Sequence, residues 1–289
     1  MAVPRLFCFG LGYSALVLAR RLAASGWVAG GTCRSIEKAA VLAAAGFHAD
    51  LFGRDRPLAR ERLHGITHLL VSAPPDPVGD PVLDRHGGDI AAMPGLRWLG
   101  YLSTTAVYGD RGGGWVDETS PLLPTGERGR RRVAAEKGWL DLWRDQSVPV
   151  HIFRLAAIYG PGRSTLDGLR AGTAKRIDKP GQVFSRIHVE DLASVLIASM
   201  THPRPGAVYN VCDDDPAPPE AVVAYAASLL GMPPPPLVPL AAAGLSPMAQ
   251  SFYDDNKRVA NALIKKELGI KLRFPDYRAG LAAILADGR

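Results

Sequence analysis

Two glycines near the start of the sequence, Gly10 and Gly12, have the spacing of a turn that binds a phosphate group. They follow the apolar residues 6–9 and precede apolar residues at helical spacing, which predicts a strand, a tight turn and a helix. Gly10 permits the turn, Gly12 lets a pyrophosphate approach the backbone, and Ala15 allows helix and strand to pack closely. The helix N-terminus offers free N–H groups and a positive dipole end to an anion. The residues expected to meet the pyrophosphate are Gly10, Gly12, Tyr13 and Ser14.

The end of the second predicted strand, residues 27–33, decides which dinucleotide this turn would accept. An NAD site places Asp or Glu there, where it accepts a hydrogen bond from the ribose 2′-hydroxyl. This sequence has two hydroxyls and two cations instead, namely Thr32, Arg34, Ser35 and Lys38. They suit a 2′-phosphate, so we expect NADP(H) to be favoured over NAD(H). The alternative is a solvated strand end whose basic residues are there by chance. Ser35 is also expected to cap a helix that runs to residue 45.

Two further strands are expected to end beside this one. The strand near residues 47–52 carries Asp50, whose carboxylate would meet the adenine amino group. The strand at residues 66–72 is terminated by a proline pair. The residues expected to contact the dinucleotide here are Asp50, Leu51, Ser72, Ala73 and Pro74. Residues 76–95 are rich in Pro, Gly and Asp and are expected to form a loop or a broken helix.

A fifth strand, residues 96–103, leads into three successive hydroxyl side chains, Ser103, Thr104 and Thr105. A sixth strand is expected at residues 149–156. Strands that alternate with helices at this rhythm predict an α/β fold, a Rossmann-type doubly wound parallel sheet.

The composition fits a globular protein with a large core. The chain has 289 residues, of which 47% are hydrophobic, enough for one large or two closely packed domains. Its formal charge is +6 and its pI is near 9.3, but the basic residues are scattered apart from a run at residues 128–132. This scatter argues against nucleic acid as a partner. The glycine turn begins early and no apolar run reaches membrane-spanning length, so we expect no leader, no membrane partner and a cytoplasmic protein.

The cysteines and histidines predict neither a disulfide framework nor a metal centre. Cys8, Cys33 and Cys212 are far apart and lie in or beside predicted strands, where a free thiol behaves as a small buried group. His64 and His68 are four residues apart, but Gly65 and a strand-like run argue against a shared helix face.

Five stretches of the sequence resemble the extended short-chain dehydrogenase/reductase family, which holds NAD-dependent epimerases and dehydratases. They are GLGYSA at 10–15, YLSTTAVYGD at 101–110, RLAAIYGPGR at 154–163, RIHVEDLASVL at 186–196 and YNVCDD at 209–214. The resemblance implies a nicotinamide dinucleotide cofactor and a small C-terminal substrate-binding subdomain. The expected Rossmann domain covers residues 1–163 with 184–212 returning to it, and the expected subdomain covers residues 164–183 and 213–289. Residues 256–280 are similar to the tail of a small atypical subgroup.

The chemistry that the resemblance implies needs a Ser or Thr after the fifth strand, and a Tyr followed four residues later by a Lys. The hydroxyl partner would be Ser103, Thr104 or Thr105, of which we favour Thr104 and Thr105. The Tyr and Lys are missing. Family members usually carry an acidic residue four positions after this Lys, and Glu136 matches it. With this alignment, Arg128 occupies the Tyr position and Arg132 the Lys position, called the Tyr slot and the Lys slot below. Because an arginine stays protonated, Arg128 cannot exchange a proton as a phenol does.

Two side chains are considered as partial substitutes for the missing pair. Arg132 would bind a cofactor phosphate or ribose as a fixed cation; the alternative is a basic, solvated helix face. Tyr108 would act as the acid; the alternative is a tyrosine that packs its loop onto the sheet. A later Tyr253 with Lys257 has the right spacing, but its place in the chain indicates a chance match.

The remaining expected ligand contacts follow the sixth strand. By the resemblance, the turn at Tyr159 crosses the nicotinamide end of the cofactor, and Arg163 is a candidate contact for an anion. Family members often carry a substrate-binding arginine four residues before His188, whereas this sequence has Arg186 two residues before it. The expected substrate contacts are therefore Arg163, Arg186 and His188, although His188 and Asp191 are also suited to setting a strand-to-helix join. Residues 164–180 are expected to be irregular, as a cover.

Two classes of function remain open on the sequence. One is an NADP(H)-binding, atypical member of this family that acts as an oxidoreductase or epimerase/dehydratase on a small polar substrate, such as a sugar derivative. The other is a dinucleotide-binding sensor or regulator that keeps the fold without turnover. An RNA-associated protein that uses the arginine run is a third idea, and it requires salt-dependent affinity. A monomer or a homodimer is expected.

Overall fold

The computed structural model describes residues 3–288 and divides them into two compact units. Unit 1 comprises residues 1–104, 130–154 and 193–209, of which residues 1 and 2 lie outside the described part. Unit 2 comprises residues 105–129, 155–192 and 210–289, of which residue 289 lies outside it.

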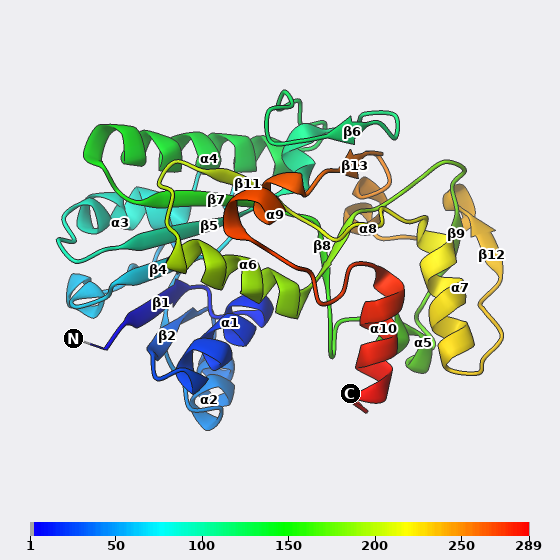
Figure 1. Cartoon of the computed structure of the whole chain (residues 1–289), viewed down its shortest axis with the longest axis horizontal. Helices are drawn as coiled ribbons and strands as arrows, with labels where there is room; N and C mark the ends of the chain where they lie inside the picture. Colours follow the sequence, from blue (N-terminus) through cyan, green and yellow to red (C-terminus); the bar gives the residue numbers. More distant parts are fainter. Residues whose placement is uncertain (1–2, 289) are drawn as a thin grey trace. The chain divides into compact units, whose positions relative to one another are not determined.

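Unit 1 is built on a seven-stranded sheet in the order β11-β7-β5-β4-β1-β2-β3 (Figure 1). The strands are β1 (Arg5–Phe9), β2 (Val28–Cys33), β3 (His48–Leu51), β4 (His68–Val71), β5 (Trp98–Thr104), β7 (Val150–Leu155) and β11 (Val208–Val211). The pairs of β1 with β2 and β4, of β2 with β3, and of β4 with β5 are parallel. This order reverses between β1 and β4, as in a doubly wound sheet, and it confirms the predicted Rossmann-type fold.

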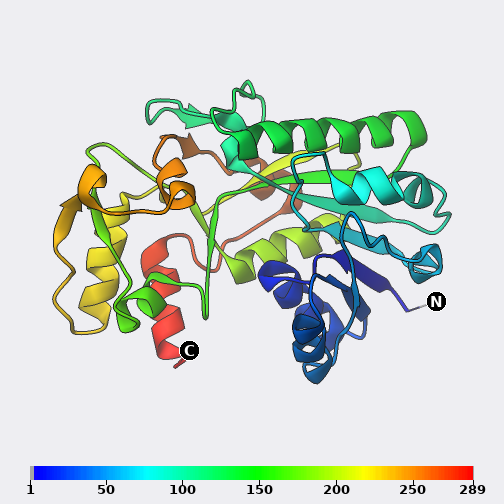
Figure 2. The same cartoon turned by 180° about the vertical axis from the view of Figure 1, so that it is seen from behind.

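Helices cover both faces of this sheet (Figures 1 and 2). They are α1 (Tyr13–Ala24), α2 (Ile36–Ala44), α3 (Pro81–Ala91), α4 (Glu127–Gln146) and α6 (Val189–Thr201), with a short 3₁₀ turn η1 (Arg60–Leu63). One core cluster joins α3 and α4 to β1, β4, β5 and β7, and the fully buried Trp139 of α4 lies in it. On the other face α1 contacts β2, and Arg21 of α1 donates to Ser194 of α6 at 2.9 Å. Ser35 caps α2 as predicted, accepting from the N–H of Lys38.

One prediction for this unit was wrong. Residues 76–95 contain the 11-residue helix α3 in place of a loop or a broken helix. The carboxylate of Asp80 accepts hydrogen bonds from the N–H groups of Val82 and Leu83, and Pro81 occupies the first helical position, where its missing N–H costs nothing. The Asp-Pro pair is therefore a helix start that outweighs the two glycines inside α3.

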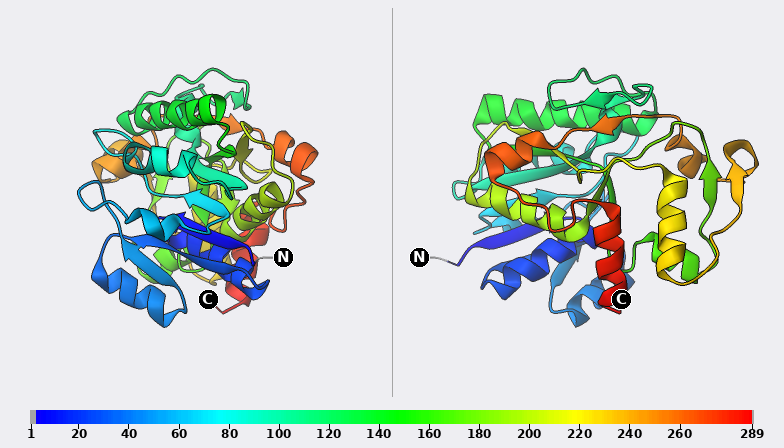
Figure 3. Two further views of the ribbon diagram at one scale, coloured as in Figure 1. Left: turned by 90° about the vertical axis from the view of Figure 1, so that its left-hand side faces the viewer. Right: turned by 45° about the vertical axis from the view of Figure 1, so that its right-hand side comes forward.

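Unit 2 is made of short elements. They are η2 (Thr105–Tyr108), β6 (Trp115–Val116), β8 (Ala157–Tyr159), α5 (Thr165–Arg170), β9 (Arg176–Asp178), β10 (Arg186–His188), α7 (Pro219–Leu229), β12 (Leu237–Pro239), η3 (Leu240–Ala242), α8 (Pro247–Ser251), β13 (Arg258–Val259), α9 (Ala262–Leu268) and α10 (Tyr277–Ala286). Three parallel strand pairs form, β8 with β10, β9 with β12 and β6 with β13. Helices α5, α7 and α10 pack around one apolar core (Figure 3).

The expectation of an irregular segment at residues 164–180 was wrong as well. Ser164 and Asp167 form a capping box that starts α5, with the Ser164 N–H donating to the Asp167 carboxylate at 2.8 Å. Strand β9 follows and pairs with β12.

Among the described residues, no helix combines the length and the apolar character needed to cross a membrane.

We expect unit 1 to lose stability in acid because of the buried His151 in β7. Its ring is fully buried, its Nε2 accepts from the N–H of Arg204 at 2.8 Å, and its Nδ1 lies 3.3 Å from the carbonyl oxygen of Leu99. Burial lowers the pKa of His151 from 6.5 to about 4. The native state therefore binds fewer protons than the unfolded chain between these two pH values. The stability that neutral His151 contributes is complete above about pH 6.5 and is lost as pH falls through about 4, by of order 1–3 kcal/mol.

Denaturant unfolding measured near pH 7 and near pH 5 tests this expectation. His151→Gln, which keeps a donor and an acceptor without titrating, should reduce the pH dependence of the unfolding free energy. An identical pH profile for the native protein and the variant would show that His151 does not contribute.

Candidate functional site

The glycine turn is held between β2 and the segment that follows β4. The N–H of Gly10 donates to the hydroxyl of Thr32 at 2.9 Å, and the N–H of Leu11 donates to the Thr32 carbonyl oxygen at 2.7 Å. Gly10 has a φ of +91°, and a Cβ on it would lie 3.1 Å from the backbone nitrogen of Ala73. Its lack of a side chain is therefore required by the fold itself.

Gly12 differs from Gly10 because space is open beside it. A Cβ on Gly12 would meet no atom within 4 Å, and its φ of −89° suits any residue. Gly12 is the N-cap of α1, no side chain caps this helix, and its first turn holds no acidic residue. Ala15 is fully buried against the sheet. Open space in front of an uncapped helix N-terminus fits the pyrophosphate of a dinucleotide, with Tyr13 and Ser14 in the first turn.

The four residues at the end of β2 separate into two kinds. The hydroxyls of Thr32 and Ser35 are used within the protein, the first by the N–H of Gly10 and the second by the N–H of Lys38. The side chains of Arg34 and Lys38 are exposed and form no hydrogen bond or ion pair within residues 3–288. Glu37 in the first turn of α2 bonds to its own backbone and to Ser35, which lowers its pKa. Two unused cations therefore lie at this strand end.

The other predicted dinucleotide contacts lie at the same edge of the sheet. The carboxylate of Asp50 is shared between Arg62 at 2.9 Å and His48 at 3.2 Å. Leu51 pairs with Cys33 of β2. The N–H groups of Ser72 and Ala73 both donate to the carbonyl oxygen of Phe9 at 2.9 Å, and Pro74 is exposed. The structure thus brings the glycine turn and the ends of β2, β3 and β4 together, as expected for parallel strands.

Ser103 points into the core of unit 1. Its hydroxyl donates to Glu136 Oε1 at 2.5 Å, and Arg154 donates to the same carboxylate, with Nη2 2.8 Å from Oε2. Glu136 is 2% and Arg154 5% exposed. This buried network ties α4 to β5 and β7, so the hydroxyl of Ser103 is occupied.

The two arginines in the Tyr and Lys slots are both held by neighbours. Arg132 donates to the carbonyl oxygen of Leu102, and its guanidinium lies 5.5 Å from the centre of the Tyr101 ring. Arg128 is exposed, and its guanidinium lies 5.2 Å from the centre of the Phe252 ring. Arg132 is therefore a fixed cation at the end of β5, and Arg128 belongs to the surface of unit 2.

The other hydroxyls after β5 have different surroundings. Thr104 and Thr105 are partly exposed, and the hydroxyl of Thr105 has no partner among the described residues. Tyr108 has no exposed surface, and its hydroxyl donates to Asn210 Oδ1 at 2.7 Å. This geometry favours the packing alternative for Tyr108, whose catalytic role stays a prediction.

Most residues of unit 2 that are predicted to contact a ligand form hydrogen bonds within the protein. The hydroxyl of Tyr159 donates to the carbonyl oxygen of Asp276 at 3.3 Å, and Arg163 closes an exposed turn with Gly160. His188 is 2% exposed and its Nδ1 accepts from the N–H of Glu190, while burial lowers its pKa to about 4. Asp191 stands at the start of α6 as expected, and its carboxylate accepts the N–H groups of residues 273 and 274.

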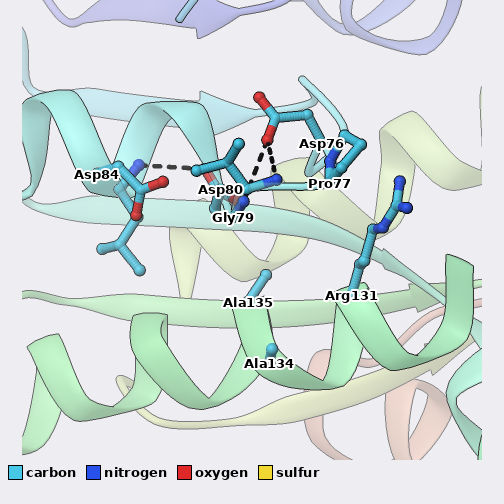
Figure 4. Close-up of a pocket in the computed structure, with 10 residues that line it drawn as sticks. Asp76, Pro77, Gly79, Asp80, Asp84, Arg131, Ala134 and Ala135 are labelled. Atoms are coloured by element: carbon cyan, nitrogen blue, oxygen red, sulfur yellow. Dashed lines mark hydrogen bonds between the residues drawn. The ribbon is translucent and has the colours of Figure 1, made fainter. Parts of the chain in front are cut away.

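Two features escaped the sequence interpretation. Asp213, first of three aspartates after β11, is 1% exposed, although nothing in the sequence around it singles it out. A cavity of about 250 Å³ lies between the segment before α3 and helix α4, lined by Asp76, Asp80, Asp84 and Arg131 among others (Figure 4). Arg54 pairs with Asp76 at 2.7 Å and with Asp84 at 2.8 Å, so two of these carboxylates already have a counter-ion. None of the predicted site residues lines this cavity.

Several known proteins are similar to this chain. A family model described as the NAD dependent epimerase/dehydratase family matches residues 41–212. The solved structure of a functionally unknown conserved protein from Silicibacter pomeroyi is 55% identical, with a TM-score of 0.91 and 99% of each chain covered. Protein YeeZ of Escherichia coli K12 is 33% identical over 178 residues, 61% of this chain. That match spans 58% of YeeZ, less than two thirds of its length.

A second curated relative is covered more fully. The 3-diazoavenalumate denitrifying reductase of a Streptomyces species is 30% identical over 244 residues, which are 76% of this chain and 77% of the reductase. Together with the match over residues 41–212, the uncapped glycine turn and the doubly wound sheet, this settles the family that the sequence resemblance predicted. The chain belongs to the NAD dependent epimerase/dehydratase family, whose members bind a dinucleotide on a Rossmann-like fold.

Proposed function

We propose that this protein binds NADP(H) and acts as an oxidoreductase or epimerase/dehydratase on a small polar substrate. The observation that carries the cofactor preference is the pair Arg34 and Lys38 at the N-terminus of α2. Both are exposed, and their side chains have no partner among residues 3–288. The neighbouring carboxylate of Glu37 is engaged with Ser35 and its own backbone. A 2′-phosphate would give both cations an acceptor, whereas a 2′-hydroxyl would leave them unused.

The residues that would hold the cofactor follow from the open space at Gly12. The N–H groups at the start of α1 would bind the pyrophosphate, Arg34 and Lys38 the 2′-phosphate, and Arg132 would lie near the ribose as a fixed cation. A bound nicotinamide would supply hydride exchange. Thr104 and Thr105 would orient the reacting oxygen of the substrate through hydrogen bonds.

Turnover is the test that separates an enzyme from a binding protein. NADPH oxidation should be followed with a panel of aldehydes and 4-keto sugars, and at least one substrate should be reduced. The reductase named among the relatives favours this outcome. The second candidate, a dinucleotide sensor without turnover, is favoured by Arg128 in the Tyr slot and by the buried Tyr108. Tight NADPH binding with no turnover on the whole panel would support the sensor.

The roles of the hydroxyls can be separated by substitution. Thr104→Val and Thr105→Val, singly and together, should lower kcat by about 100-fold in the most affected variant, because a donor to the reacting oxygen is lost. NADPH affinity should change little. Ser103→Ala is the matched control, because its hydroxyl bonds to Glu136 inside the core. It should lower the unfolding free energy by about 1–2 kcal/mol and leave kcat nearly unchanged. A loss of turnover in Ser103→Ala alone would contradict the assignment.

A further inference from the structure

Two ionisable side chains inside unit 2 have hydrogen-bonding capacity that the described residues do not use. The carboxylate of Asp213 is buried; its Oδ1 accepts from the N–H of Asp215 at 3.4 Å, and its Oδ2 has no partner in the described chain. Arg186 is partly exposed, and its Nη1 donates to the carbonyl oxygens of Phe184 at 2.8 Å and Ala217 at 3.1 Å. Its Nε and Nη2 have no acceptor among residues 3–288.

These two residues are neighbours, yet their side chains do not satisfy each other. The N–H of Asp213 donates to the carbonyl oxygen of Arg186 at 2.6 Å, so the backbones lie side by side. No ion pair joins the two side chains within the described residues. Buried polar groups in proteins are normally paired. An unpaired carboxyl oxygen beside two free guanidinium donors therefore leaves a position for a third group.

The free edge of Arg186 has the geometry that binds a carboxylate. Arg54 and Arg154 show this use in unit 1. Arg54 places Nε and Nη2 on the two oxygens of Asp76 at 2.7 and 3.0 Å, and Arg154 presents the same two nitrogens to Glu136. In Arg186 no described residue accepts from this fork of Nε and Nη2, while the bonds of Nη1 fix the orientation of the guanidinium. Such a fork takes a carboxylate or a phosphate with two parallel bonds.

The neighbouring charges favour a single negative charge on the ligand. The acids Asp213 and Asp215 both lie near Arg186, and Asp215 is already paired with Arg278 at 2.9 Å. With Asp213 neutral, the single cation Arg186 would be poorly matched to a doubly charged phosphate or a pyrophosphate. A carboxylate is the anion that fits this balance.

We propose that Arg186 and Asp213 form a carboxylate-binding subsite in unit 2, with the guanidinium fork on both ligand oxygens and the Asp213 carboxyl hydrogen-bonded to one of them. The subsite deepens the proposed function by making the substrate a carboxylic acid. Its role in a reaction rests on that function, but the binding itself does not.

The protonation of Asp213 gives this subsite a pH dependence. Burial raises the pKa of Asp213 to about 8, against the opposing influence of Arg186 and of the Asp215 N–H. Two neighbouring acids are already paired, Asp214 with Lys265 and Asp215 with Arg278. Tyr159 and Cys212 also lie near Asp213, and burial raises their pKa values. Below about pH 8 the carboxyl group of Asp213 is neutral and donates to the ligand; above it the ionised group repels the ligand. Binding should therefore weaken as the pH rises past this value.

The experiment uses the full chain without dinucleotide, so that it is independent of cofactor binding. Benzoate and acetate are compared with inorganic phosphate and pyrophosphate at matched ionic strength, near pH 6.5 and near pH 9. Affinity is measured by isothermal titration calorimetry at both pH values. The contact is located near pH 6.5 from the arginine Nε–H signals of ¹⁵N-labelled protein, in which the Arg186 signal is identified by its loss in Arg186→Lys. Arg278→Lys is the matched control, because Arg278 lies in the same unit but is already paired with Asp215.

We expect a carboxylate to shift the Arg186 signal saturably, with affinity about tenfold or more weaker in Arg186→Lys and nearly unchanged in Arg278→Lys. Asp213→Asn should bind at both pH values and lose the pH dependence. Absence of saturable shifts, tighter binding of phosphate than of carboxylates, or an unchanged pH profile in Asp213→Asn would overturn the proposal. Carboxylate binding in a protein that neither binds nor oxidises NADPH would uphold it while removing the proposed function.

Discussion

Replacement of Glu136 by alanine is expected to lower the free energy of unfolding by about 3–5 kcal/mol. The substitution removes the carboxylate that Arg154 and Ser103 share, and it leaves the buried guanidinium of Arg154 without its partner. An uncompensated buried charge is costly because neither water nor a counter-ion replaces the lost interaction. Urea unfolding followed by circular dichroism measures the change.

Two control variants show whether the cost comes from the unpaired charge. Lys137→Ala on the same helix breaks an exposed pair with Asp141 and should cost less than about 1 kcal/mol. The double variant Glu136→Leu with Arg154→Leu removes both charges and should be more stable than Glu136→Ala. If Glu136→Ala unfolds at nearly the same denaturant concentration as the native protein, the network does not stabilise unit 1.

Gly12→Asp is expected to abolish dinucleotide binding while the fold keeps its stability. The side chain would enter space where no protein atom lies within 4 Å, and aspartate is a favourable N-cap for α1. The same carboxylate would stand where the pyrophosphate needs to approach and would repel it. We expect affinity for NADPH to fall by more than about 100-fold, about 2.7 kcal/mol, with an unchanged or higher Tm.

Gly95→Asp and Gly10→Ala are the matched comparisons for this variant. Gly95 also has open space and is exposed, so the same added charge there should affect neither stability nor binding. Gly10→Ala should destabilise the protein, because φ is +91° and the backbone of Ala73 is close. Normal NADPH binding by Gly12→Asp would show that the dinucleotide does not lie at this helix.

The parts of unit 1 that depend on residues close together in the sequence were predicted correctly. The glycine turn, the cap at Ser35 and the alternation of strands with helices each rest on residues close together in the chain, and the structure contains all of them. The start of α3 is signalled locally by Asp80 and Pro81, but the surrounding glycines and prolines are typical of loops and obscure this signal.

Side-chain directions could not be predicted where tertiary packing decides them. Six consecutive residues of β5, from Trp98 to Ser103, are buried, so no polar alternation shows that Ser103 turns towards Glu136. The burial of Asp213 could not be predicted because it depends on segments distant in the chain. Likewise, nothing near Arg128 in the sequence indicates that its partner is Phe252.

The central claim, an NADP(H) site at the ends of β1 and β2, is tested most directly by paired titrations of NADPH and NADH. Nicotinamide fluorescence is followed with the native protein, with Arg34→Ala, and with Arg20→Ala as an exposed-cation control on α1. We predict that NADPH binds about tenfold tighter than NADH or better, about 1.4 kcal/mol, and that only Arg34→Ala removes most of this preference. Equal affinity for the two cofactors would contradict the preference, and failure to bind either would mean that the glycine turn serves the architecture alone.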